Sequence, residues 1–389
     1  MDRDDLKILM IATELPPSFG GAAVQALCLA RELREKGLIV EFVSDNGAEK
    51  SREDSLEDFS VYRLSTAGKR GKLRNLVFAL KLFGFIAGSS SRYDIVHFHS
   101  ANGYEIPFFP LFKLMKKKIV LKLTLAGSDD PLTLKRRKLG KVFFWGLGFV
   151  DKFIAISNRL VDLALESGID RGKVELIPNG VDIEKFSATS ADERSHLRKK
   201  LGFEAFDKLF FSAGKLEERK GYTFILESWK HISAKFPRAA LLIGGPGNAG
   251  DNAYFTSLKE MIVSESLNNV FFLGMVDNID EYMKISDCFL FASRLEGFGS
   301  VQIEALSSSV PVVSRNIEGI TADIIRDEHI GRICRTESPS DFAHLAVSCL
   351  EDSDTEKRRK AADQIRSEFD IKRIAGKYME LYRTLMETS

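Results

Sequence analysis

Short runs of β-branched and aliphatic residues alternate with longer amphipathic segments along almost the whole chain. The clearest expected strands are Lys7–Ala12 and Leu38–Ser44 near the start, and Leu209–Ala213 and Ala239–Ile243 further along. Strands this apolar, separated by helical segments, are typical of parallel sheets that are covered by helices on both faces. We therefore expect an α/β protein built from doubly wound, Rossmann-like sheets.

The alternation is interrupted once and then restarts, which predicts two domains in the 389 residues. The break lies in Ile177–Phe186, where Pro178, Asn179 and Gly180 prevent regular structure. We place one Rossmann-like domain over 1–180 and a second over 181–368, followed by a C-terminal helix over 369–389. Two such domains would face each other across a deep cleft, because ligands bind at the carboxyl ends of parallel strands.

Composition excludes several classes of protein. The formal net charge is only +1, so no global polyelectrolyte role is implied. No stretch approaches the roughly 18 apolar residues that cross a bilayer, and the start MDRDDLKILM does not resemble a secretory signal. The four cysteines lack C-x-x-C spacing, and the six histidines form no H-E-x-x-H. We expect a cytoplasmic protein with no metal site.

Gly20 and Gly21 form the first candidate binding motif, since they follow an expected strand and open the next helix. Glycines there let backbone N–H groups approach an anion at a helix N-terminus. The spacing matches neither a dinucleotide fingerprint nor a P-loop. A plain strand-to-helix turn is an equally good interpretation.

Lys215 and Lys220 form the second candidate, because both follow the expected strand Leu209–Ala213. Two ammonium groups at the carboxyl end of a strand suit a diphosphate. The alternative is a solvated charged loop, the commoner fate of such sequences.

The third and strongest candidate is Ser293–Glu304, which follows the expected strand Cys288–Ala292. Two glycines allow a tight turn before a helix that begins near Ser300, whose first N–H groups favour a diphosphate. Glu304 could accept both hydroxyls of a ribose diol, and Glu296 could face a second hydroxylated group. The alternative is a helix cap with a solvated Glu296.

With these residues in place, the chain resembles the retaining glycosyltransferases of the GT-B fold, family 4 (glycosyl transferases group 1). The resemblance covers nearly the whole chain and rests on six segments: Gly20-Gly21, FIAISNRLVD, IPNGVDIEKF, GKLEERKG, EGFGSVQIE and ALSSSVPVV. It implies a UDP-, GDP- or ADP-sugar donor that is bound mainly by the second domain. It also implies an acceptor bound by the first domain, and a last helix that crosses back onto that domain.

Carried over residue by residue, the resemblance assigns roles in the second domain. Lys215, which stands where arginine is common, and Lys220 would hold the diphosphate. Glu304 would bind the ribose, and Val276 lies where backbone groups meet the base. The transferred sugar would meet Glu296 and the segment Gly297, Phe298, Gly299, Ser300 and Val301. The residues closest to catalysis would be Glu296, Lys215 and Lys220.

The stretch Lys122–Asp129 departs from the family pattern, because it lacks a histidine that many relatives carry there. His99 and Asp129 are then the polar residues expected to line the sugar and acceptor side. A packed, hydrogen-bonded histidine at a strand end is an equal alternative for His99.

The segment Arg63–Lys141 is strongly basic, with 17 basic and 4 acidic residues (17 − 4 = +13), and it is rich in aromatic residues. Such a region suits a peripheral contact with an anionic membrane, at the inner face of the plasma membrane. Solvated lysines over a buried aromatic core are the main alternative. Nucleic acid is not expected as a partner, because the motifs of the second domain indicate other chemistry.

These observations predict a hexosyltransferase that acts on a glycan or lipid-linked acceptor, in polysaccharide, lipopolysaccharide or glycolipid assembly, without a metal cofactor. The resemblance implies that the reaction retains the anomeric configuration. A GT-B-like sugar-nucleotide epimerase or a phosphorylase is the alternative enzyme, although neither constellation is visible. A two-lobed binding protein without catalysis is the third.

Overall fold

The computed structural model describes residues 6–18, 20–45, 50–101, 103–247, 253–351 and 354–387. The chain divides into two compact units. Unit 1 comprises Met1–Gly180 together with Ile371–Ser389, and unit 2 comprises Val181–Asp370. The terminal segment therefore belongs to unit 1, although 190 residues of sequence separate it from the rest of that unit.

Unit 1 is built on an eight-stranded sheet whose strands lie in the order β3-β4-β2-β1-β5-β6-β7-β8. All neighbours pair in parallel except the edge pair β3 and β4, which is antiparallel. The strands are β1 (Lys7–Ile11), β2 (Ile39–Asp45), β3 (Arg52–Leu56), β4 (Phe59–Leu64), β5 (Ile95–His99), β6 (Lys118–Leu123), β7 (Lys152–Ala155) and β8 (Val174–Leu176).

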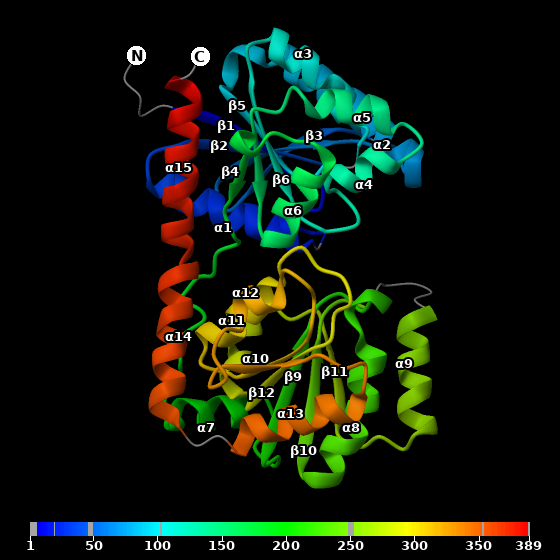
Figure 1. The fold of residues 1–389 in the computed structure, drawn as a ribbon, viewed down its shortest axis with the longest axis vertical. Coiled ribbons are helices and arrows are strands. Elements are labelled where there is room, and N and C mark those ends of the chain that lie inside the picture. Colours follow the sequence, from blue (N-terminus) through cyan, green and yellow to red (C-terminus); the bar gives the residue numbers. More distant parts are fainter. Residues whose placement is uncertain are drawn as a thin grey trace. The chain divides into compact units, whose positions relative to one another are not determined.

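Helices cover both faces of this sheet (Figure 1). The α-helices of unit 1 are α1 (Gly21–Glu35), α2 (Gly71–Gly88), α3 (Phe109–Leu114), α4 (Pro131–Arg136), α5 (Gly140–Leu147), α6 (Asn158–Ser167) and α15 (Ile371–Glu387). Helices α1 and α15 pack against each other and share one apolar core with β1, β2 and β5. The C-terminal helix α15 is thus a structural layer of unit 1, because its apolar face completes that core.

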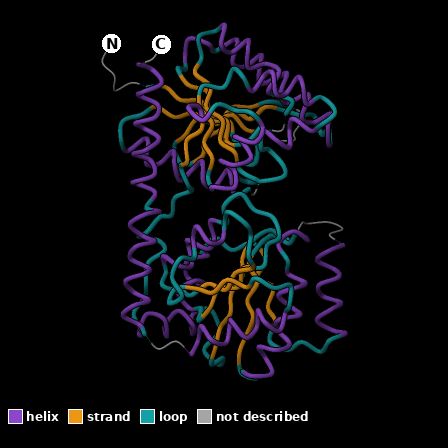
Figure 2. Tube along the Cα trace, viewed as in Figure 1, coloured by secondary structure: helices purple, strands orange, loops and turns teal. Residues whose placement is uncertain are grey.

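Unit 2 repeats the design with a six-stranded, entirely parallel sheet in the order β11-β10-β9-β12-β13-β14. Its strands are β9 (Lys208–Ala213), β10 (Ala239–Gly244), β11 (Val270–Gly274), β12 (Cys288–Phe291), β13 (Val312–Arg315) and β14 (Gly331–Cys334). Its α-helices are α7 (Ala191–Lys200), α8 (Tyr222–Lys235), α9 (Ala253–Ser264), α10 (Ile279–Ile285), α11 (Ser300–Ser307), α12 (Thr321–Ile324), α13 (Pro339–Glu351) and α14 (Thr355–Phe369). Figure 2 shows a strand core within a shell of helices in each unit.

The predicted fold class is confirmed by these two Rossmann-like sheets. The sequence analysis missed β3, β4 and β14. The physical reason is clear for β3, because its residues REDSL lie at an edge of the sheet and none of them is buried. An edge strand without an apolar face lacks the alternation that identifies strands.

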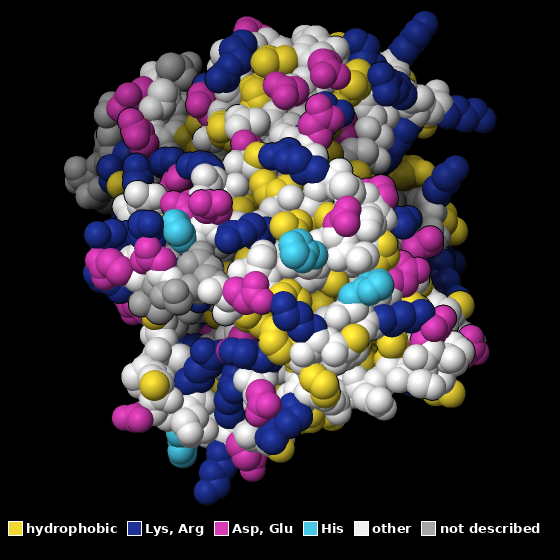
Figure 3. Space-filling view, turned by 60° about the horizontal axis from the view of Figure 1, so that its bottom comes forward, with side chains coloured by type: hydrophobic (Ala, Val, Ile, Leu, Met, Phe, Trp, Pro, Cys, Tyr) yellow, Lys and Arg dark blue, Asp and Glu magenta, His cyan; other side chains and the backbone are white. Residues whose placement is uncertain are grey.

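Three further properties of the described residues are relevant to function: helix hydrophobicity, the state of the cysteines and the distribution of surface charge. No described helix is long and apolar enough to cross a bilayer. All four cysteines lie within the described ranges as thiols rather than disulfides, and Cys288, Cys334 and Cys349 are buried. On the face drawn in Figure 3, basic and acidic side chains are interspersed over most of the surface.

Candidate functional site

The loops that follow β9 and β12 lie against each other at the carboxyl edge of the unit 2 sheet. Gly221 is the N-cap of α8 and has a φ of +72°, and a Cβ there would lie 2.2 Å from the carbonyl oxygen of Ala292. The amide of Arg294 donates a hydrogen bond to the carbonyl of Arg219 at 2.8 Å. Only glycine fits at position 221, so the sequence itself allows this close approach.

The approach of the two loops joins Lys220 to Glu296. The Lys220 ammonium donates to the Glu296 carboxylate, with 2.5 Å between Nζ and Oε1. Glu296 is 7% exposed, so the pair is largely shielded from water. The stem of Lys220 also passes close to Gly214, at the end of β9. Two residues that lie 76 positions apart, and that the sequence analysis assigned to a diphosphate and a sugar, therefore form one charged unit.

Arg219 is a charged residue of this site that the sequence analysis did not single out. Its guanidinium donates to the Glu217 carboxylate at 2.9 Å and to the Leu295 carbonyl at 3.3 Å, and it lies 3.7 Å from the Glu296 carboxylate. Its place in GKLEERKG, beside Lys220, was the available signal. Arg219 ties the first loop to the second.

The N-terminus of α11 follows shortly after Glu296. Gly299 has a φ of +84° and forms the N-cap, and a Cβ there would lie 2.6 Å from the side-chain amide of Gln302. Phe298 is buried, with its ring centroid 5.7 Å from that of Phe369, so only its backbone could meet a ligand. The amides of Ser300 and Val301 belong to the first turn of α11, where helix N–H groups lack intrahelical partners. Gly297 precedes this turn and is buried.

Glu304 lies one turn into α11 and is partly exposed. Burial of its carboxyl group raises its pKa to about 7, and the charge of Lys185 opposes that shift. A carboxyl with such a pKa changes its charge close to neutral pH. Glu304 can therefore accept hydrogen bonds from a diol in its ionised form.

The ends of β9, β10 and β11 converge through glycines. The amide of Gly214 donates to the Gly244 carbonyl at 2.9 Å, and the amide of Gly245 donates to the Gly274 carbonyl at 2.7 Å. A Cβ on Gly245 would lie 1.9 Å from the Gly214 carbonyl oxygen, so this crossing needs glycine. Val276 lies just beyond β11 and is half-buried, with its side chain beside Gly244.

Lys215 directly follows Gly214, at the carboxyl end of β9, and is half-buried. The phenol of Tyr222 donates to the carbonyl of Gly214 at 2.9 Å, so α8 fixes the backbone beside Lys215. Lys215, Lys220, Glu296 and the start of α11 therefore belong to one edge of one sheet.

Gly20 and Gly21 lie in unit 1, at the start of α1 and beyond β1. Gly20 is buried, and a Cβ there would lie 2.3 Å from a carboxylate oxygen of Glu14. Gly21 is exposed, and no atom lies within 4 Å of the position that a Cβ would occupy there. The need for glycine is thus established for Gly20 alone.

His99 ends β5 and is buried beside His97, with 4.1 Å between the ring centroids. Burial lowers the pKa of His99 well below the usual value, so its imidazole is neutral. Among the described residues, neither ring nitrogen of His99 has a hydrogen-bond partner. The neighbouring His97 contacts α15, where the Tyr382 hydroxyl and Nδ1 of His97 form a hydrogen bond at 2.7 Å.

Asp129 is buried in the loop after β6. Its carboxylate accepts from the amides of Thr124 and Leu125 and from the Thr124 hydroxyl, at 2.6 to 3.1 Å. Burial raises its pKa, while these hydrogen bonds oppose the shift. Asp129 thus holds the backbone of its own loop.

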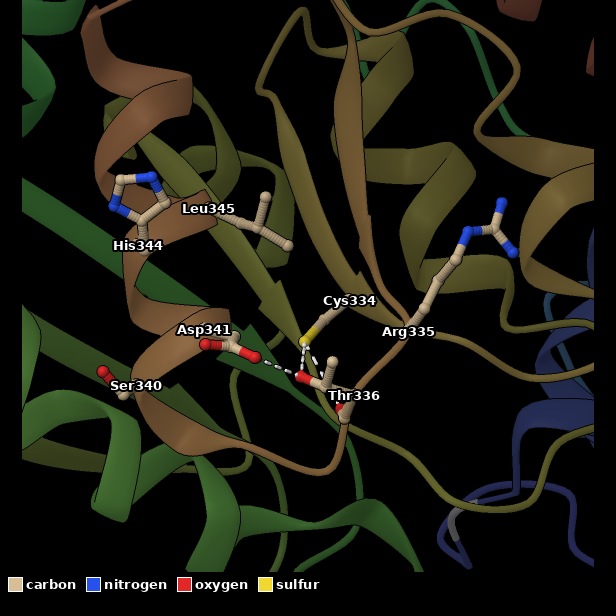
Figure 4. A pocket seen from close by; sticks show the side chains of 7 residues that line it. All are labelled: Cys334, Arg335, Thr336, Ser340, Asp341, His344 and Leu345. Atoms are coloured by element: carbon tan, nitrogen blue, oxygen red, sulfur yellow. Dashed lines mark hydrogen bonds between the residues drawn. The ribbon is translucent and has the colours of Figure 1, made fainter.

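A hollow of about 370 Å³ lies elsewhere in unit 2, between the end of β14 and the start of α13. Thr336 connects Cys334 and Asp341 there, and Figure 4 shows Arg335 directed away from the other labelled side chains. None of the predicted donor-binding residues lines this hollow. Within the described ranges, no group of three or more His, Cys, Asp or Glu residues is arranged to hold a metal ion.

Two family profiles match successive parts of the chain. The family profile "Glycosyl transferases group 1" matches residues 193–368, and the profile "Glycosyltransferase Family 4" matches residues 19–185. The chain carries the two domains of a GT-B glycosyltransferase. The first profile includes the charged loops described above.

Relatives of this glycosyltransferase include the N-acetyl-alpha-D-glucosaminyl L-malate synthase of Bacillus anthracis, which is 22% identical over 96% of each chain. The UDP-Gal:alpha-D-GlcNAc-diphosphoundecaprenol alpha-1,3-galactosyltransferase of Escherichia coli is 26% identical over 75% of each chain. Among solved structures, Anabaena HepE in complex with UDP and glucose has a TM-score of 0.77 at 19% identity, covering 97% of this chain and 99% of that one. This likeness confirms the GT-B fold.

Proposed function

We propose that this glycosyltransferase transfers a hexose from a UDP-, GDP- or ADP-sugar to a glycan or lipid-linked acceptor, with retention of configuration. The observation that carries the proposal is the Lys220–Glu296 pair, which lies at the same sheet edge as Lys215 and the first amides of α11. A nucleotide sugar is bound by both cations and carboxylates. Its diphosphate binds cations, and the hydroxyl groups of its sugar and ribose donate hydrogen bonds to carboxylate oxygens.

The diphosphate gains negative charge as the bond between its oxygen and the sugar C1 breaks. Lys215, Lys220 and the N-terminal amides of α11 would stabilise that charge where it develops. Glu304 would hold the ribose, and Val276 would lie near the base. Glu296 and the backbone of Gly297–Ser300 would orient the hexose.

Front-face attack fits the carboxylates of this site. The new bond forms between an acceptor hydroxyl oxygen and C1, and the acceptor proton passes to the departing phosphate oxygen. Glu296 is held by Lys220 and is assigned to the sugar, and Glu304 is assigned to the ribose, so no carboxylate is assigned to nucleophilic attack.

We also propose that the reaction needs no metal, because two lysines and a helix N-terminus supply the positive charge at the leaving group. Activity that survives a chelator such as EDTA would support this, and activity restored only by added Mg²⁺ or Mn²⁺ would contradict it.

A cytoplasmic location is part of the proposal, and the thiol state of the cysteines supports it because disulfides are rare in reducing compartments. A role in polysaccharide, lipopolysaccharide or glycolipid assembly is supported by the E. coli relative, whose name gives a diphosphoundecaprenol acceptor. UDP is the first nucleotide to test, since the HepE structure contains UDP and glucose.

The decisive experiment is a screen of sugar nucleotides for slow donor hydrolysis, which requires no knowledge of the acceptor. Thermal stabilisation by UDP, GDP or ADP, measured in parallel, reports binding alone. We expect one nucleotide to stabilise the protein and its sugar conjugate to be hydrolysed. Stabilisation by a free sugar, with no response to any nucleotide, would overturn the proposal.

A further inference from the structure

Helix α2 of unit 1 is apolar on two opposite faces. Phe78, Leu82 and Ile86 are buried against the unit. On the other side of the helix, Leu73 and Leu80 are both 52% exposed. Leu76 lies between them at helical spacing and is also exposed, so the three leucines form one stripe. An ordinary surface helix presents polar residues on that side.

Two neighbouring helices also carry exposed apolar residues. The Phe83 ring stacks on Phe108 at 5.2 Å, which joins α2 to the start of α3, and α3 packs against α5. Leu114 of α3 is 79% exposed and Trp145 of α5 is 56% exposed. These helices lie on one flank of unit 1 (Figure 1). We call the exposed apolar residues of these three helices the apolar flank: Leu73, Leu76, Leu80, Leu111, Leu114, Val142 and Trp145.

The segment 63–141, which carries five of the seven residues of the apolar flank, is rich in exposed basic side chains and lacks exposed acidic ones. That stretch contains only four acidic residues. Three of them, Glu105, Asp129 and Asp130, are buried, and the half-buried Asp94 accepts a hydrogen bond from the amide of Lys7. The exposed basic residues of the stretch are Lys69, Arg70, Lys72, Lys81, Lys116, Lys135, Arg136, Arg137, Lys138 and Lys141.

We propose that the apolar flank docks onto the surface of an anionic lipid bilayer. Leucines and a tryptophan amid lysines match an interface whose outer layer is negatively charged and whose inner layer is hydrocarbon. A second copy of this chain is a poor occupant, because two surfaces that carry the same positive charge repel each other. The positive charge would also attract nucleic acid, but a nucleic acid has no hydrocarbon layer in which the exposed leucines could be buried.

The docking itself does not depend on the proposed function. One consequence rests on it: an enzyme held at a bilayer meets an acceptor that is anchored there, so the acceptor is lipid-linked rather than a free glycan.

The test is sedimentation of the full chain with vesicles of phosphatidylcholine alone or mixed with phosphatidylglycerol. We expect binding to the mixed vesicles, and much weaker binding when salt rises from about 0.1 M to about 1 M, because the Debye length falls from about 10 Å to about 3 Å. Equal binding to both vesicle types, or no binding at low salt, would overturn the proposal.

Two sets of variants locate the surface. Leu73→Ser combined with Leu80→Ser should weaken vesicle binding about tenfold, by removing apolar side chains that insert. Lys69→Glu combined with Lys72→Glu should weaken it at least as much at low salt. The matched control is Val263→Ser on α9 of unit 2, where the valine is 78% exposed, and it should bind like the wild type. Equal losses in the control would overturn the proposal.

Three further readouts separate the other interpretations. Thermal stabilisation by UDP should be the same in every variant, which shows that the variants fold. Vesicle binding without any nucleotide response would overturn the proposed function but leave the docking intact. Binding to duplex DNA in place of vesicles, or a dimer that the leucine variants dissolve, would overturn the docking.

Discussion

The two units share a parallel sheet design, but the carboxyl edges of their sheets differ in charge. In unit 2, Lys220 and Glu296 meet at 2.5 Å, and Glu304 lies nearby on α11. In unit 1, His97, His99 and Lys122 lie at the ends of β5 and β6, and all three are buried. Burial lowers the pKa of Lys122 to about 7 and keeps both imidazoles neutral.

The difference shows that topology alone does not make a charged binding site. Helix α15 covers the ends of β5 and β6 with Tyr378 and Tyr382, so burial disfavours the charged forms of the polar groups beneath it. The β9 and β12 loops of unit 2 instead bring an ammonium group and a carboxylate together in one ion pair.

The largest effect is expected for Lys220→Met. It removes a cation from the leaving group and leaves the buried Glu296 carboxylate without its ammonium. We expect kcat for donor hydrolysis or transfer to fall about 10²–10³-fold. Lys230→Met is the control, because Lys230 forms an exposed ion pair with Glu265 on the surface of the same unit. If kcat of Lys220→Met fell by less than about twofold, Lys220 would not contribute to the reaction.

The next effect is on nucleotide affinity. Glu304→Ala would remove charged hydrogen bonds to the ribose of about 1.5–3 kcal/mol, which is about a 10- to 100-fold weaker Kd for the nucleotide. Because the pKa of Glu304 is about 7, the wild-type affinity should rise between about pH 6 and pH 8 as the carboxyl ionises. Glu304→Gln should abolish that rise. A pH profile unchanged by the substitution would contradict the assignment.

A third prediction compares glycines in the two units. Gly221→Ala puts a Cβ close to the Ala292 carbonyl and forces alanine to a φ of +72°. We expect a loss of about 1–3 kcal/mol in the free energy of unfolding, measured with denaturant, together with weaker nucleotide binding. Gly21→Ala in unit 1 meets no atom within 4 Å and should be neutral or slightly stabilising. Equal losses in both would mean that the loop contact at Gly221 is not specific.

The last prediction concerns the buried lysine of unit 1. The pKa of Lys122 is lowered from 10.5 to about 7, so the unfolded chain binds more protons than the folded one between these values. The wild type should therefore gain stability as pH rises from about 7 to about 10. Lys122→Met should remove this dependence and stabilise the protein most at about pH 7, by about 1–3 kcal/mol. Denaturant midpoints at the two pH values measure it, and a parallel pH dependence in the variant would contradict it.

The sequence by itself determined the fold class, and it predicted which loops of unit 2 would bind the donor. Period and polarity are local properties, so the runs around Leu209–Ala213 and the glycines of EGFGSVQIE could be interpreted without coordinates. An edge strand such as β3 escaped this reasoning because it has no apolar face.

Only the tertiary structure decided which of these residues meet. The Lys220–Glu296 pair forms because two loops that are 76 residues apart in the sequence come into contact. Helix α2 has two apolar faces, and the packing of unit 1 decides which of them is buried and which leucines are exposed. It also decided that His97 lies beneath α15, although the helix is far away in the chain, and that His99 beside it is buried. Charge state and accessibility follow from burial, and burial is a property of the packed chain rather than of any segment of it.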